Sequence, residues 1–213
     1  MKNVIDHFAI GAMNLEQGIA VLQKQLGVVV PRGGKHEAMS THNCVTKAGE
    51  GHFLEVIAID PDAPDPGRSR WFTLDDPATV ARLSERPRPL CWVVGTDDLD
   101  SVVANSPVDL GEIVHFSRGE RTWRLTVPTD GSLPEAGLLP AFIEWSPGPH
   151  PSAGMQDLGL RLQAINLRHP DPAALTRKLK ALNVDHLANV MNGTEPTISF
   201  VIRTGEGDSI ELV

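Results

Sequence analysis

Three short apolar segments of this chain each carry a single glutamate. The first, residues 52–59, has the length of a strand and lies between Gly49-Glu50-Gly51 and a stretch rich in Pro and Asp. This pattern predicts a buried β-strand with a turn at each end. The carboxylate at its centre, Glu55, is costly to bury unless it is paired, protonated or bound to a metal. The pattern recurs around Glu144 and Glu211, which predicts a repeated unit.

The residues before Glu55 complete the first predicted unit. Residues 4–11 alternate as a strand does, which places His7 on one face and Asp6 on the other. Helical spacing follows, with Asn14 as the predicted N-cap and Gly27 as the stop. In chain order, the predicted elements are a strand at 4–11, a helix at 13–27, an extended piece at 28–30, a turn at 32–34, and strands at 41–48 and 52–59.

The same β-α-β-β-β order is predicted twice more. The predicted second unit has a strand at 90–95, a helix at 98–105 capped by Thr96 or Asp97, and strands at 112–117, 122–127 and 139–145. The predicted third unit has a strand at 160–167, a helix at 171–182, a poorly marked strand within 187–190, and strands at 197–203 and 209–213. A period of this length is typical of a duplicated supersecondary module rather than of a solenoid.

These units predict an α+β fold. Tandem βαβββ modules are expected to form a curled mixed sheet, or half-barrel, around a central cavity, together with a shorter third module of the same type. The unpaired third module is expected either to cap the barrel edge or to build a homodimer interface. The predicted divisions are a first module at 1–60, a linker or lid with a short helix at 61–89, a second module at 90–151 and an incomplete third module at 158–213.

Composition excludes several classes of function. The chain has 213 residues, a formal charge of −8 and a pI of about 5.4 without a Lys/Arg cluster, so no nucleic-acid partner is expected. Apolar runs are too short to span a bilayer, and residues 1–7 enter a strand without a signal-peptide core, so no membrane partner is expected. Cys44 and Cys91 are interpreted as reduced thiols of a cytoplasmic protein. No Gly-rich phosphate loop follows a strand, which argues against nucleotide binding.

Pairing two modules edge to edge brings their first and fourth strands to the cavity. The inward positions are then predicted to be His7 and Glu55 from the first module, and Cys91 and Glu144 from the second. Histidine and glutamate are suitable ligands for Zn²⁺, Fe²⁺, Mn²⁺ or Ni²⁺. The alternative is structural: His7 as a core histidine bonded to backbone, and both glutamates as carboxylates paired with an arginine such as Arg124.

Several segments together resemble a known family. They are Ile5-Asp6-His7-Phe8-Ala9-Ile10-Gly11, Thr41-His42-Asn43, Phe53-Leu54-Glu55-Val56-Ile57, Trp123-Arg124-Leu125-Thr126-Val127-Pro128, and Phe142-Ile143-Glu144-Trp145 with His150-Pro151. As a set, over roughly residues 1–151, they resemble a glyoxalase-like domain. That domain is a branch of the vicinal oxygen chelate superfamily, which also holds glyoxalase I, extradiol dioxygenases and fosfomycin-resistance proteins.

The resemblance implies a divalent metal (Zn, Ni, Mn or Fe) that holds two substrate oxygens while a neighbouring carboxylate moves a proton. Carried over by position, His7, Glu55 and Glu144 are the metal-ligand candidates, and Glu55 and Glu144 the catalytic ones. Cys91 departs from the family, whose enzymes usually have a second histidine there. The candidate substrate-binding residues are His42, Asn43, Cys91, Trp92, Trp123, Arg124 and His150.

Two hypotheses of function follow. The first is a metal-dependent lyase, isomerase or dioxygenase that acts on a small oxygenated molecule. The second is a non-catalytic protein of the same fold that binds or sequesters a small molecule without metal, which Cys91 favours. A homodimer is expected in either case. The structural interpretation is preferred for Glu211, and surface positions are expected for His36, His52, His115, His169 and His186.

Overall fold

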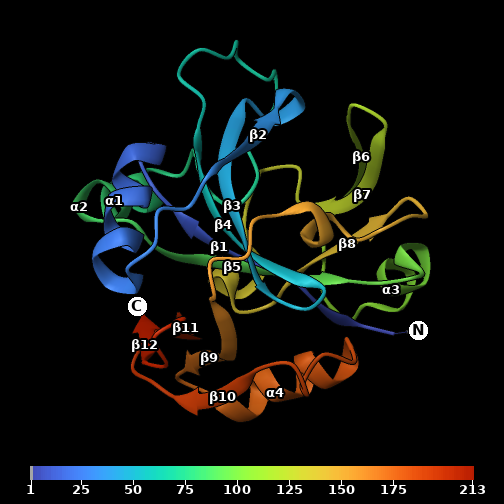
Figure 1. The fold of residues 1–213 in the computed structure, drawn as a ribbon. Coiled ribbons are helices and arrows are strands. Elements are labelled where there is room, and N and C mark those ends of the chain that lie inside the picture. The colour runs from blue at the N-terminus through green and yellow to red at the C-terminus, as the bar shows by residue number, and fades with distance from the viewer. Residues whose placement is uncertain (1) are drawn as a thin grey trace.

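Three modules of β-α-β-β-β order make up residues 2–213, the part of the chain that the computed structural model describes (Figure 1). The first contains β1 (Val4–Gly11), α1 (Leu15–Leu26), β2 (Arg32–His36), β3 (Thr41–Gly49) and β4 (His52–Ile59). The second contains β5 (Arg88–Gly95), α3 (Leu99–Asn105), β6 (Glu112–Arg118), β7 (Arg121–Val127) and β8 (Ala141–Trp145). The third contains β9 (Arg161–His169), α4 (Pro172–Ala181), β10 (Asn189–Asn192), β11 (Thr197–Arg203) and β12 (Ser209–Leu212). The connection between the first two modules holds α2 (Pro77–Glu85), and short 3₁₀ turns lie at Glu37–Met39, Pro134–Gly137 and Pro151–Gly154.

The first two modules form one curled eight-stranded sheet. Its strand order is β2-β3-β4-β1-β5-β8-β7-β6, so the modules join through the antiparallel pair of β1 and β5. In that pair His7 lies opposite Val93 and Ala9 opposite Cys91, which makes His7 and Cys91 equivalent positions of a two-fold repeat. The predicted fold class, tandem βαβββ modules in a curled sheet, is confirmed.

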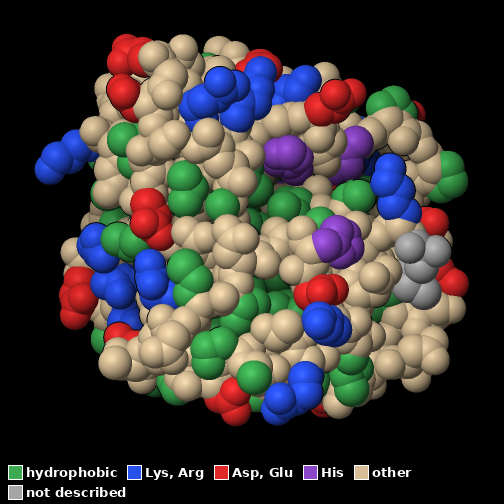
Figure 2. All heavy atoms as spheres, turned by 90° about the horizontal axis from the view of Figure 1, so that it is seen from below, with side chains coloured by type: hydrophobic (Ala, Val, Ile, Leu, Met, Phe, Trp, Pro, Cys, Tyr) green, Lys and Arg blue, Asp and Glu red, His purple; other side chains and the backbone are tan. Residues whose placement is uncertain are grey.

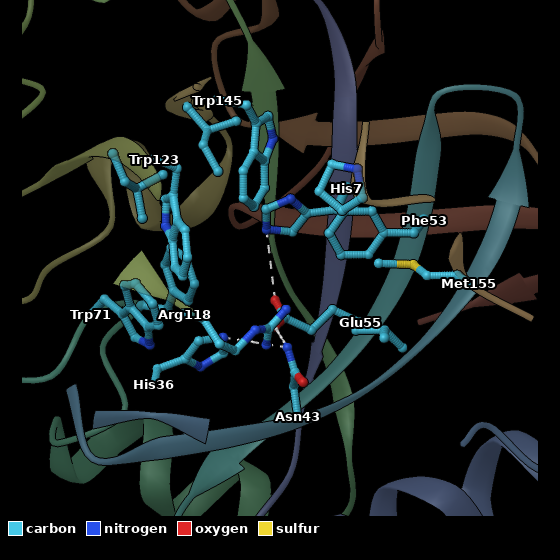
Figure 3. A pocket seen from close by; sticks show the side chains of 15 residues that line it. His7, His36, Asn43, Phe53, Glu55, Trp71, Arg118, Trp123, Trp145 and Met155 are labelled. Atoms are coloured by element: carbon cyan, nitrogen blue, oxygen red, sulfur yellow. Dashed lines mark hydrogen bonds and ion pairs between the residues drawn. The ribbon is translucent and has the colours of Figure 1, made fainter. Parts of the chain in front are cut away.

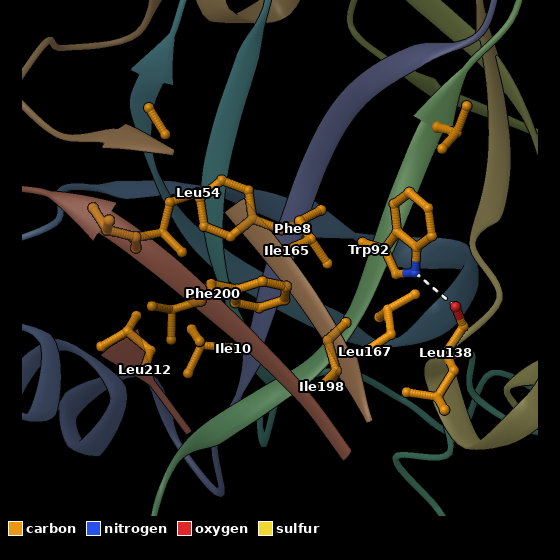
Figure 4. Close-up of a cluster of buried hydrophobic side chains, with 14 of the residues drawn as sticks. Phe8, Ile10, Leu54, Trp92, Leu138, Ile165, Leu167, Ile198, Phe200 and Leu212 are labelled. Carbon is orange, nitrogen blue, oxygen red and sulfur yellow. Dashed lines mark hydrogen bonds between the residues drawn. The ribbon is translucent and has the colours of Figure 1, made fainter. Parts of the chain in front are cut away.

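The third module covers the outer face of this sheet. Its strands form a separate sheet in the order β10-β9-β11-β12, which lies at the bottom of Figure 1. Phe200 packs on Phe8 with ring centroids 4.8 Å apart, and both belong to one continuous apolar core (Figure 4). The edge strands β2 and β6 pair with no strand of this module, so the expectation that the third module caps a barrel edge is wrong.

Helix α1 covers the same outer face beside β3 and β4. Leu15, Leu22 and Leu26 are buried at helical spacing, and the predicted caps are present at both ends. The Asn14 side chain accepts from the Gln17 amide, and Gly27 ends the helix in the left-handed conformation, which glycine adopts without a steric cost.

The face of the third module is polar and mixed in charge. Seen from below, acidic and basic side chains are interspersed, with histidines on one side (Figure 2). Within residues 2–213 no helix combines the length and apolar character needed to cross a bilayer.

Candidate functional site

A small cavity lies on the inner face of the eight-stranded sheet (Figure 3). Its volume is about 40 Å³, room for about three waters at roughly 10–15 Å³ each. Its walls are mostly aromatic, and polar side chains converge at one side. The cavity lining includes His7, His36, Asn43, Phe53, Glu55, Trp71, Arg118, Trp123 and Trp145.

A β-bulge brings Asp6 to the side of His7. The pairing of β1 with β5 shifts between Ile5 and His7, so Asp6 has no partner on β5 and strict alternation breaks at this point. Asp6 is buried, and its carboxylate accepts from His7 Nδ1 at 2.6 Å, from Trp145 Nε1 at 2.7 Å and from His150 Nε2 at 2.9 Å. The interpretation from alternation, which placed Asp6 on the outer face, is wrong for this reason.

These contacts set the protonation of both groups. Burial opposes the charge of Asp6, but the hydrogen bonds and charges of His150 and His7 outweigh it and lower the pKa of Asp6 to about 2. Burial likewise opposes the imidazolium form of His7. The hydrogen bond and charge of Asp6, with the charge of Glu55, outweigh it and raise the pKa of His7 above its usual value. Asp6 therefore favours the protonated form of His7, in which Nδ1–H is given to Asp6.

Glu55 faces the other nitrogen of the same ring. Its Oε1 accepts from Asn43 Nδ2 at 2.6 Å, and its Oε2 lies 3.7 Å from His7 Nε2. A separation of 3.7 Å is longer than a hydrogen bond, so the two groups are not bonded to each other, and both line the cavity. Glu55 is 4% exposed, and the amide of Asn43 fixes one oxygen while leaving the other free.

His36 supports Asn43 and carries no charge. Its Nδ1 lies 3.0 Å from Thr41 Oγ1 and its Nε2 3.4 Å from Asn43 Nδ2. Burial lowers the pKa of His36 to about 4, so Nε2 is an acceptor for the amide. Because His36 lines the cavity, the default expectation of a surface position is wrong.

Two adjacent glycines of β2 allow this arrangement. A Cβ on Gly33 would lie 2.2 Å from Asn43 Oδ1, and a Cβ on Gly34 would lie 2.4 Å from Arg118 Nη1. The Gly34 amide donates to Asn43 Oδ1 at 2.8 Å. The turn predicted at 32–34 is wrong, because these residues lie in strand β2. Its two glycines allow the side chains of Asn43 and Arg118 to lie close to the backbone.

The second predicted glutamate does not reach the cavity. Glu144 accepts from Arg124 Nη2 at 2.5 Å and from the Leu99 amide at 3.0 Å, as in the structural alternative, whereas its neighbours Ile143 and Trp145 line the cavity. The register explains this difference. Ala9 lies opposite Glu55, and its repeat equivalent Val93 lies opposite Ala141, so the repeat equivalent of Glu55 is Ala141. Glu144 is three positions away, an odd number, and faces outward; the expectation that it points inward is wrong.

The other predicted residues divide between the two faces. Asn43 and Trp123 line the cavity, and His150 reaches it through Asp6. Cys91 faces inward but is fully buried beneath the cavity, where burial raises the pKa of its thiol well above the usual value. Three residues lie elsewhere: Trp92 donates to the Leu138 carbonyl in the outer core, His42 lies 3.9 Å from Asp60, and Arg124 pairs with Asp100 and Glu144.

The donor set does not fit the metal that the resemblance implies. Only His7 and Glu55 face each other across the cavity floor, and their repeat equivalents are Cys91 and Ala141, a buried thiol and a methyl group. Within residues 2–213 no group of three or more His, Cys, Asp or Glu side chains could hold a cation. Catalytic zinc sites typically supply three protein ligands, and this site supplies two.

The family follows from a comparison with known domains. A family model described as a glyoxalase-like domain matches residues 5–183. This chain belongs to that family. The match confirms the resemblance to a glyoxalase-like domain. It also extends beyond residue 151 into the third module of this glyoxalase-like protein.

One solved structure shows the same fold at low sequence identity. A hypothetical protein from Staphylococcus aureus is similar with a TM-score of 0.66 and 13% identity, over 94% of this chain and 91% of that one. Methylmalonyl-CoA epimerase from Mycobacterium tuberculosis is similar with a TM-score of 0.43 and 14% identity, over 70% of this chain and 91% of that one. No curated protein matches the chain.

Sequence reasoning missed four of the residues that shape the site. Arg118 could have been found, because it follows the inward Phe116 by two positions on the same strand. The direction of the Asp6 side chain depends on the β-bulge in β1. The position of His36 depends on the path of β2, which contains two glycines. Trp71 lies in the connection between modules, where no periodic pattern indicates the direction of a side chain.

Proposed function

We propose that this glyoxalase-like protein binds a small oxygenated molecule in the cavity and moves a proton on it with His7 and Glu55. The observation that carries the proposal is the 3.7 Å gap between His7 Nε2 and Glu55 Oε2 on the cavity floor. A buried acid and a buried base that face a common space form an arrangement suited to general acid–base catalysis.

The roles follow from the hydrogen bonds. Glu55 Oε2 is the free oxygen of a carboxylate whose other oxygen is held by Asn43, so it removes a proton from the carbon next to a carbonyl. His7, protonated beside Asp6, donates Nε2–H to the carbonyl oxygen as negative charge develops there. Return of both protons gives back the carbonyl compound, with its carbon proton exchanged or delivered to a different position. No step passes through a metal, because the donor set holds two ligands.

Deuterium exchange tests this scheme directly. Pyruvate in D₂O with the purified protein is expected to take up deuterium at C3, measured by NMR. Glu55→Gln keeps the acceptor for Asn43 but removes the base, and is expected to slow the exchange by about 10²-fold or more. Treatment with EDTA is expected to leave the rate unchanged. Exchange that requires added Zn²⁺ or Mn²⁺ would overturn the metal-free scheme.

The non-catalytic alternative rests on Cys91 and Ala141, which leave the second half of the repeated site without polar groups. Under this alternative, a set of 2-oxo acids binds, seen as a rise in melting temperature, but no member exchanges protons in D₂O. Glu55→Gln then leaves binding unchanged within about twofold. The two candidate functions are separated by these measurements on one preparation.

A further inference from the structure

One side of the cavity presents two hydrogen-bond donors that no acceptor among residues 2–213 satisfies. Trp71 lines the cavity and is 4% exposed, yet its Nε1–H has no partner within residues 2–213. Buried N–H groups are rarely left without an acceptor. Because Trp71 lines the cavity, its unpaired donor indicates an acceptor brought by a ligand.

The second donor is the guanidinium of Arg118, which enters the cavity from the edge strand β6 (Figure 3). The neighbouring arginines of this module are engaged: Arg124 pairs with Asp100 and Glu144, and Arg121 lies over the Trp145 ring at 5.8 Å. In the described chain, Arg118 has no carboxylate within ion-pair distance. Arg118 is otherwise exposed, and the missing Cβ of Gly34 leaves the space that Nη1 occupies.

The surroundings favour an anion at this side. His36 packs edge-on against Trp71 with ring centroids 5.0 Å apart and is uncharged, since burial lowers its pKa to about 4. The carboxylate of Asp6 is already saturated by three donors, and Oε1 of Glu55 is held by Asn43. The guanidinium of Arg118 is therefore the unpaired charge beside Trp71, and guanidinium groups bind planar oxyanions with two parallel hydrogen bonds.

We infer that Trp71 Nε1 and the Arg118 guanidinium form a carboxylate-binding subsite, so that the substrate is a short 2-oxo acid. The size of the cavity carries the second half of this inference. Both donors and the His7–Glu55 pair line one space of about 40 Å³, so the anchored carboxylate, the carbonyl and the reacting carbon belong to consecutive positions of one small molecule. This assignment rests on the proposed function for the choice of the reacting carbon, but the anion subsite itself does not.

Calorimetric titration with pyruvate and with pyruvamide, its uncharged isostere, tests the subsite. The wild-type protein is expected to bind pyruvate about tenfold or more tightly than pyruvamide, because charge-assisted hydrogen bonds are the stronger ones. Arg118→Gln is expected to weaken pyruvate binding about tenfold, and Trp71→Phe, which keeps the aromatic ring, about three- to tenfold. Both variants are expected to leave pyruvamide binding within about twofold.

Arg177→Gln is the matched control, because it removes the same charge from an exposed position on α4. It is expected to leave both affinities unchanged. Equal binding of pyruvate and pyruvamide, an equal loss of both in Arg118→Gln, or no binding of pyruvate would each overturn the subsite. Charge-dependent binding without C3 exchange would overturn the proton-transfer proposal and leave the subsite standing. Deuterium exchange at C3 together with equal binding of pyruvate and pyruvamide would overturn the subsite and leave the proton-transfer proposal standing.

Discussion

Asp6 determines the chemistry of His7 without facing the ligand itself. A buried carboxylate with three donors is strongly stabilised in its charged form, and it holds the His7 ring in a fixed orientation. Its folded-state pKa of about 2 lies below the usual 3.8. Its contribution to stability is therefore fully present above pH 3.8 and is lost as the pH falls toward 2. The difference amounts to about 2 kcal/mol.

Asp6→Asn is expected to remove this acid-dependent step from the free energy of unfolding, measured by urea denaturation between pH 5 and pH 2. It is also expected to lower the pKa of His7, measured by NMR of the imidazole nitrogens, because the largest factor left is burial. Proton exchange should then be lost at a lower pH than in the wild type. Asp208→Asn, at an exposed turn, serves as the control. An unchanged pKa of His7 would contradict the role given to Asp6.

Two glycines that both exclude a Cβ are expected to respond in opposite ways. At Gly34 the clash is with the guanidinium of Arg118 at 2.4 Å, the far end of a flexible side chain. Gly34→Ala should change the free energy of unfolding by less than about 0.5 kcal/mol but weaken pyruvate binding several-fold. At Gly18 the clash is with Val56 Cγ1 at 2.3 Å in the core. Gly18→Ala should cost about 1–3 kcal/mol from overpacking, although alanine is the better helix former.

These two variants are measured by urea unfolding and by calorimetric titration with pyruvate. A large loss of stability in Gly34→Ala would mean that Arg118 is fixed more firmly than its exposed position indicates. A stabilised Gly18→Ala protein would contradict the close approach of α1 to β4.

At the scale of elements, the segment between α2 and the first module covers the cavity. It carries Trp71 and Phe72 into the cavity wall. Phe72 and Thr73 have φ of 60° and 58°, a left-handed conformation that is costly for a β-branched residue. The Thr73 amide donates to the Gly131 carbonyl at 2.8 Å. The second module therefore holds this strained segment over the site.

Gly131→Ala is expected to displace this segment. A Cβ at position 131 would lie 2.1 Å from the Arg70 carbonyl oxygen, and φ is +72°. The substitution should lower the free energy of unfolding by about 2–3 kcal/mol, because the left-handed conformation and the backbone clash both oppose a side chain there. Acrylamide quenching of tryptophan fluorescence should increase as Trp71 leaves the cavity wall. Gly67→Ala has a similar φ of +70° but no neighbour within 4 Å, so it should cost only about 1 kcal/mol and leave quenching unchanged.

The elements could be predicted from the sequence wherever local chemistry decides them. Asn14 and Gly27 mark the ends of α1 because capping is local, and the alternation of 52–59 identifies β4. The inward direction of His7 and Glu55 follows from the period of two. The position of Glu144 could not be predicted, because the apparent repeat ignores a register that only strand pairing determines. The bulge at Asp6 likewise depends on how β5 pairs with β1.

At the scale of the whole molecule, the third module closes the core of the other two. The outer face of the large sheet contributes Phe8, Trp92 and Phe142, and the small sheet covers it with Ile165 and Phe200. An uncovered apolar sheet face of this kind would be prone to aggregation. The site on the inner face therefore depends on a module that contributes nothing to its lining.

Phe200→Ala tests whether the two sheets unfold as one unit. Phe200 is fully buried and packs against Phe8 of the large sheet with the two rings tilted by 59°. Its truncation is expected to cost about 3–5 kcal/mol. Urea unfolding followed by tryptophan fluorescence and by far-UV circular dichroism should still give a single coincident transition, because the core is continuous. All four tryptophans of the chain precede the third module, so fluorescence reports on the large sheet alone.

Val29→Ala, at a 56% exposed position, is the control for this variant, with an expected change within about 0.5 kcal/mol. If the circular dichroism transition of Phe200→Ala precedes the fluorescence transition, the third module melts independently. That outcome would contradict a single core. With one cooperative core, the loss of stability in Phe200→Ala should lower the temperature at which pyruvate binding disappears and leave pyruvate affinity unchanged below it, because the cavity lies on the opposite face of the sheet.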